Sequence, residues 1–193
     1  MAPKQQRNRR SRLATTLLPG SGKPSNPEQV VRSVWLQGPP TKLTSQSSTG
    51  LITAVITPSL NDLSNTNWRN IADEYRIKEI VFHAYPVGAN SGVTAFILDD
   101  EDSTLPIIGD TKARRAKFLV NNSANQKSLS SFHYRCENIE DLKWISCKSA
   151  GSATPMALKV YTDLSTYITQ PSTDLWVINY EALFEFRGIG NNS

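Results

Sequence analysis

Most of the chain alternates between short runs rich in β-branched and aromatic residues and clusters of glycine, proline, asparagine and serine. This pattern is typical of β-strands separated by turns. It predicts eight strands, at 30–36, 50–57, 76–85, 93–98, 131–136, 142–147, 156–161 and 175–187. The last is the clearest, because alternate positions from Trp176 to Phe186 are apolar and are therefore predicted to share one buried face.

One segment has a helical period instead. Trp68, Ile71, Ala72 and Tyr75 are spaced as neighbours on one helix face, and the polar residues 65–67 before them can cap a helix. We therefore expect a short helix at 67–74 that packs Trp68, Ile71 and Tyr75 against the body. The basic stretch 112–120 fits either a second helix or an edge strand, and the pattern does not decide between them.

Eight strands with one or two short helices predict an all-β fold, an eight-stranded antiparallel sandwich over residues 30–193. The jelly roll and the immunoglobulin-like sandwich both fit this strand count. The helix between the second and third strands favours the jelly roll, because it serves as a crossover. No internal repeat and no linker divides the body, so we expect one domain there.

The N-terminal residues 1–29 differ from this body in charge. The first 27 residues carry no acidic group, whereas residues 28–193 carry 15 basic and 17 acidic groups. The cations of this segment are Lys4, Arg7, Arg9, Arg10, Arg12 and Lys23. Prolines and glycines crowd positions 17–27, which excludes a helix or a central strand there, so we expect a disordered arm.

A cationic arm of this kind is suited to binding a polyanion. Guanidinium groups on a flexible tether neutralise phosphates without reading bases, so the arm is predicted to bind RNA in a salt-dependent way. A solubilising tail or a localisation signal is the other interpretation, because basic clusters serve those purposes as well.

Several classes of function find no support in the composition. The two histidines, His83 and His133, are too few for a histidine-rich metal centre and have no evident acid–base partner, so we expect no enzyme and no small-molecule substrate. Cys136 and Cys147 are expected to be reduced and to pack as small apolar residues. No run approaches the roughly 18 apolar residues of a membrane span, and no apolar segment of a secretory signal follows the first residues.

Four acidic residues follow the strand at 93–98, and Asp99 and Asp102 are three positions apart among them. Clustered carboxylates repel one another, and hard oxygen ligands in a turn suit Ca²⁺. A calcium site at Asp99 and Asp102 is therefore one interpretation. A solvated acidic loop is the other.

The segment from Trp68 to Pro86 resembles coat proteins of small icosahedral positive-strand RNA viruses, in particular tombusvirus and sobemovirus shell domains. In that family an aromatic residue, a short helix and a Tyr-Arg pair, here Tyr75-Arg76, lead into a strand like 80–86. The family also has an acidic turn after the next strand, a basic N-terminal arm and a final strand near the C-terminus. Here these match residues 98–103, residues 4–12 and residues 175–187.

The resemblance implies a shell-only capsid subunit that assembles with itself into an icosahedral shell and packages viral RNA through its arm. It implies localisation in the virion, with assembly in the host cytoplasm. It also implies that calcium lies between subunits, held by Asp99 and Asp102 with Asn191 and Asn192 of a neighbour. Two alternatives stay open: a non-capsid nucleic-acid-binding β-sandwich protein, and a calcium-dependent carbohydrate-binding jelly roll.

Overall fold

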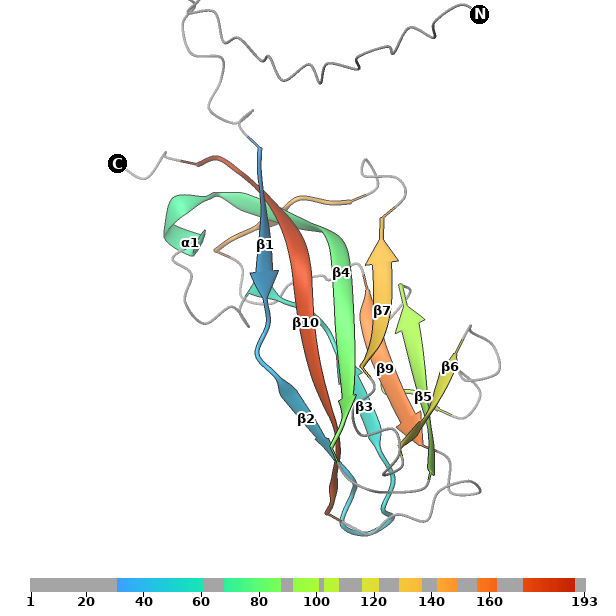
Figure 1. Cartoon of the computed structure of the whole chain (residues 1–193). Coiled ribbons are helices and arrows are strands. Elements are labelled where there is room, and N and C mark those ends of the chain that lie inside the picture. The colour runs from blue at the N-terminus through green and yellow to red at the C-terminus, as the bar shows by residue number, and fades with distance from the viewer. Residues whose placement is uncertain are drawn as a thin grey trace, which may run out of the picture.

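The computed structural model describes residues 31–60, 68–87, 92–100, 103–107, 116–121, 129–136, 142–148, 156–162 and 172–189. These residues form ten strands and one short helix (Figure 1). The elements are β1 (Arg32–Gln37), β2 (Thr41–Thr44), β3 (Thr53–Ile56), α1 (Trp68–Ile71), β4 (Glu74–Pro86), β5 (Gly92–Asp99), β6 (Lys117–Asn121), β7 (Ser130–Arg135), β8 (Ile145–Ser146), β9 (Ala157–Thr162) and β10 (Asp174–Arg187).

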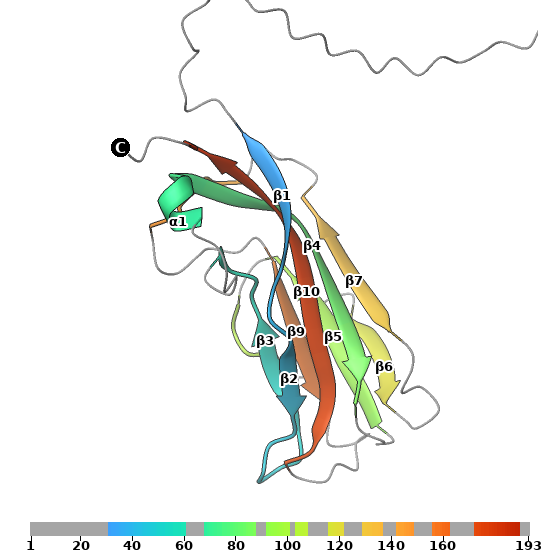
Figure 2. The same cartoon turned by 60° about the vertical axis from the view of Figure 1, so that its left-hand side comes forward.

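The strands form two antiparallel sheets, and Figure 2 shows one sheet in front of the other. The larger sheet has the order β1-β10-β4-β7, with β2 beside the first part of β10 and β8 beside the start of β4. The smaller sheet has the order β3-β9-β5-β6. The pairs β1–β10, β3–β9, β4–β7 and β5–β6 are nested in the chain, so a long ribbon of paired strands is folded over itself. That winding is a jelly roll, and the predicted fold class is confirmed.

The core lies between the two sheets. On β10 the predicted apolar face is buried at every position, and the members of this face are Trp176, Ile178, Tyr180, Ala182, Phe184 and Phe186. Trp176 meets Phe96 of the smaller sheet edge to face at 5.1 Å between ring centroids, and its indole N–H donates to Thr94 Oγ1 at 3.0 Å. Each such buried aromatic side chain stabilises the fold by about 1.5–3 kcal/mol, so β10 is the central element of the core.

The strand count of ten differs from the predicted eight. Residues 41–44 form β2 after a break at Gly38-Pro39-Pro40, where the two prolines have no backbone N–H to donate. Gly38 donates its own N–H to the carbonyl oxygen of Tyr180 at 2.9 Å, and a Cβ at Gly38 would collide with the Tyr180 ring. The chain can therefore pass over β10 only with a glycine here, and it resumes pairing as β2.

Helix α1 is shorter than the predicted helix at 67–74. It ends at Ile71, and β4 begins at Glu74, so Tyr75 is a strand residue paired with Phe186 and Ile145. Trp68 packs as expected, stacked on Phe186 with 4.3 Å between ring centroids. Ile71 is exposed, so its predicted packing was wrong: one turn of helix cannot carry its side chain to the core before the chain turns into β4.

The predicted basic segment 112–120 is described only from residue 116. Its second part is strand β6, at the edge of the smaller sheet beside β5, so the edge-strand interpretation holds for Lys117–Asn121. The other cations of this segment, Lys112, Arg114 and Arg115, lie outside the described residues. Within the described part of the chain, no helix is long and apolar enough to cross a membrane.

Candidate functional site

The predicted RNA-binding residues belong to the N-terminal segment. Lys4, Arg7, Arg9, Arg10, Arg12 and Lys23 all lie outside the described residues. The described chain begins at Val31, directly before β1, which is the edge strand of the larger sheet. The cationic segment is therefore joined to the body at that edge, and its RNA binding stays a prediction.

The acidic turn is described only in part, and its first residue is not exposed to solvent. Asp99 is the last residue of β5, and its carboxylate forms an ion pair with the ammonium of Lys159 on β9 at 2.7 Å. Both side chains are about 1% exposed or less. The neighbours of Lys159 on β9, Leu158 and Val160, pack in the core. Lys159 and its partner Asp99 therefore lie on the face of the smaller sheet that points away from the core.

This geometry bears on the predicted calcium site. The Asp99 carboxylate already has a buried cation beside it, and Asp99 in this arrangement fits an internal ion pair rather than an open metal ligand. Asp102, Asn191 and Asn192 lie outside the described residues. Elsewhere in the described structure, no three His, Cys, Asp or Glu side chains gather to hold a metal ion. Calcium between subunits therefore stays a prediction that depends on the residues after Asp99.

A second cluster of charges lies on the outer face of the larger sheet, near α1. Glu185 of β10 accepts hydrogen bonds from Arg76 and Lys78 of β4, with Arg76 Nη2 at 2.7 Å and Lys78 Nζ at 3.3 Å. The side chains are mostly covered, that of Glu185 being 8% exposed. Burial by itself would raise the pKa of Glu185, but the hydrogen bonds and charges of Arg76 and Lys78 outweigh it and lower the pKa.

Trp144 connects this cluster to the next ion pair. Its ring lies 4.5 Å from the guanidinium carbon of Arg76 and 4.4 Å from that of Arg187, both distances within the range of cation–π contacts. Arg187 is also paired with Glu74. Trp144 thereby holds the short segment around β8 against the start of β4 and the end of β10.

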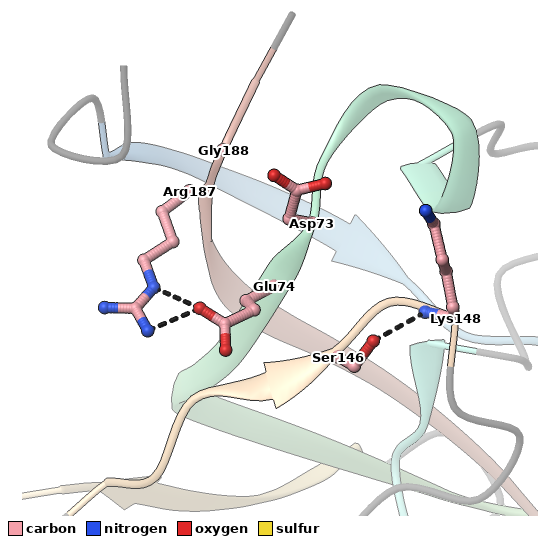
Figure 3. A pocket seen from close by; sticks show the side chains of 6 residues that line it. All are labelled: Asp73, Glu74, Ser146, Lys148, Arg187 and Gly188. Carbon is pink, nitrogen blue, oxygen red and sulfur yellow. Dashed lines mark hydrogen bonds and ion pairs between the residues drawn. The ribbon is translucent and has the colours of Figure 1, made fainter. Parts of the chain in front are cut away.

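An open pocket of about 470 Å³ lies beside these residues (Figure 3). Its lining comes from the start of β4, the end of β8, the end of β10 and the residues next to them: Asp73, Glu74, Ser146, Lys148, Arg187 and Gly188. Gly188 has φ +72°, and a Cβ there would overlap Asp73, so glycine is required where the chain leaves β10. The pocket is lined by two carboxylates, two cations and the Ser146 hydroxyl, and Arg187 and Glu74 form an ion pair within it.

The two histidines lie on the same outer face. His133 Nε2 is 2.6 Å from Glu79 Oε1, and His83 lies 3.0 Å from Ser131 Oγ and 3.5 Å from Glu181 Oε1. The structure therefore supplies carboxylate partners that the sequence did not reveal, because they come from neighbouring strands. Cys136 and Cys147 are free thiols, and Cys147 is buried as a small apolar residue.

Known proteins resemble this chain in fold rather than in sequence. No protein-family model and no curated protein sequence matches the chain. Among solved structures, the chain is similar to that of Mud crab tombus-like virus (TM-score 0.61, 8% identity, 86% of this chain and 94% of that one) and to Cocksfoot mottle virus (0.61, 10%, 84% and 98%). It is also similar to the BFDV capsid protein solved as a 60-mer (0.54, 12%, 86% and 98%). At these identities the likeness concerns the fold, and the chain has the jelly-roll fold of viral capsid shells.

Proposed function

We propose that this protein is the shell-forming subunit of an icosahedral capsid. One observation carries the proposal: the jelly roll of this chain aligns with 94–98% of the length of the three viral chains compared above, so the similarity extends over the whole shell subunit. A closed shell requires copies that bind one another through repeated surfaces, which a single compact sandwich can provide on its edges and ends.

The described residues favour a structural role over the alternatives. In the pocket Arg187 is paired with Glu74, and on the outer face Glu185 is paired with Arg76 and Lys78, as expected of groups that stabilise a fold. The sugar-binding alternative placed a calcium ion at Asp99–Asp102, and the first of these carboxylates is buried against Lys159. The non-capsid nucleic-acid-binding alternative is not favoured by the similar structures, which come from two viruses and a capsid protein.

The N-terminal segment supplies the second half of the proposal, which is binding of an RNA genome. Its six cations have no acidic residue among them, whereas the body from residue 28 has two more acidic than basic groups. The N-terminal segment therefore attracts phosphates, whereas the body as a whole carries a small net negative charge. Contacts of this type release counterions, so binding should weaken steeply as salt is raised.

Expression of the full chain followed by sedimentation tests both halves. We expect particles in the megadalton range whose ultraviolet absorbance shows packaged nucleic acid. Replacing Arg7, Arg9, Arg10 and Arg12 with glutamine should leave a folded body with a large loss of packaged RNA, because only the phosphate-binding charges are removed. A matched variant with the four arginines changed to lysine should retain most of it.

The outcomes separate the two halves of the proposal. A full chain that remains monomeric under all salt conditions contradicts the capsid role. Particles whose RNA content is the same in the glutamine variant contradict RNA binding by the arm and leave the shell role standing.

A further inference from the structure

The outer face of the larger sheet is apolar at the end opposite α1, where β4 finishes and β7 begins (Figure 1). Tyr85, Val87 and Leu129 are 38%, 47% and 49% exposed there. The β4–β7 pairing extends to Ala84 and Ser130, so Tyr85 and Leu129 lie one position beyond the last pair. We call Tyr85, Val87, Leu129 and Val177, the register partner of Tyr85 on β10, the end patch.

The end patch is held in a fixed shape by the sheet. Tyr85 follows the alternation of β4, with Ala84 and Pro86 buried on either side of it, so its ring points outward. Val87 lies beyond the end of β4, but its backbone N–H donates to the carbonyl oxygen of Leu175 at 2.9 Å. Exposed apolar side chains on such a rigid backbone bind a partner with little loss of conformational entropy.

The charges beside the end patch indicate what kind of partner it suits. Lys42 of β2 is the register partner of Val177, and its ammonium is 3.3 Å from the Asp174 carboxylate. Both side chains remain exposed, at 70% and 39%. Lys42 and Asp174 together offer one cation and one anion, so this pair has no net attraction for a polyanion such as RNA. An apolar centre with a polar rim of both signs is the composition of a protein–protein contact.

We propose that the end patch binds a second copy of this chain and forms part of the contact that closes the shell. The inference rests on the proposed capsid function, which supplies the identity of the protein partner. Lys42 and Asp174 can each meet the opposite charge on another copy, which is the complementarity that a self-association surface needs. A stable contact buries about 800 Å² on each partner, so the end patch is the apolar centre of a larger interface.

A double variant, Val87→Lys with Leu129→Lys, tests the inference. Both side chains are exposed in the subunit, so the denaturant midpoint of the unassembled chain should be unchanged. The two lysines on each copy would face those of the neighbouring copy with part of their hydration removed. The resulting repulsion should lower the yield of particles at least tenfold. The matched control, Val87→Ile with Leu129→Met, keeps the surface apolar and should assemble like the parent chain.

Each outcome decides the inference. If the lysine variant assembles like the parent chain, the end patch is not a contact, and the capsid function stands. If the conservative control also fails to assemble, the loss of particles is not caused by the added charge, and the inference fails. If the parent chain forms no particles, the capsid function fails, and sedimentation equilibrium of the subunit decides: self-association abolished by the lysine variant supports the end patch, and a parent chain that is monomeric at all concentrations overturns it.

Discussion

The two outer faces of the sandwich both carry charged side chains, but they differ in how those charges meet solvent. On the smaller sheet, Asp99 and Lys159 form one pair that is fully buried. On the larger sheet, Glu185 shares two cations that are still partly exposed, and Arg187 and Glu74 are each about one third exposed. Water therefore still stabilises the second set, whereas the first pair lies in a medium of low dielectric constant.

This difference predicts which substitutions are costly. Removing one member of a buried pair leaves an uncompensated charge in a medium of low dielectric constant, while a partly exposed charge that loses a partner is rescued by water. Substitutions on either face test this difference, and the expected effects decrease from the buried pair to the exposed groups.

The largest effect is expected for Lys159→Met. Asp99 then loses the ammonium that neutralises it, and the free energy of unfolding should fall by about 3–5 kcal/mol. Denaturant unfolding of the unassembled subunit measures this. Adding Asp99→Asn to the same chain should recover much of the loss, because no buried charge is then left alone. The exposed Lys42→Met is the matched control and should change stability little, and equal losses at Lys42 and Lys159 would contradict the comparison.

A smaller effect is expected for Glu185→Gln. Arg76 and Lys78 lose their shared carboxylate, and the free energy of unfolding at neutral pH should fall by about 1–3 kcal/mol. The pKa of Glu185 is lowered in the folded chain, so its contribution is complete above the usual pKa of 4.5 and is lost as the pH falls through the folded value. The stability difference between parent and variant should therefore shrink in acid.

Unfolding curves of parent and Glu185→Gln between neutral pH and strong acid check this sign. Lys78→Met is a useful companion, because Arg76 still pairs with Glu185 at 2.7 Å and the loss should be smaller. A stability difference that grows as the pH falls would show that Glu185 is not stabilised as a carboxylate.

The smallest effect is expected from chelating divalent cations at neutral pH. The Lys159 ammonium already neutralises Asp99, so Asp99 does not need calcium for charge compensation. Particles should therefore sediment at nearly the same rate with and without a chelator. Sedimentation and nuclease resistance with and without chelator measure this. Strong swelling on chelation would contradict internal compensation by Lys159 and would point to calcium ligands beyond Asp99, Asp102 among them.

The sequence predicted the parts of the fold that depend on neighbours along the chain. The alternation from Trp176 to Phe186 identified the buried face of β10, because successive side chains of a strand point to opposite sides. The strand predicted at 30–36 corresponds to β1, which ends directly before Gly38-Pro39-Pro40, since proline cannot continue a ladder. The alternation of apolar and polar residues did not identify β2, which is only four residues long. The helical spacing of apolar residues did not limit the helix to Trp68–Ile71.

Only the tertiary structure decided which charges meet. Asp99 and Lys159 are sixty positions apart, and nothing in the pattern of either strand indicates that β5 and β9 are neighbours or that their outer face is covered at this point. The same holds for Trp144, whose two guanidinium partners come from β4 and β10. A local period specifies which face of a strand a side chain occupies. Burial and pairing on that face depend on the strand order, which is a property of the whole folded chain.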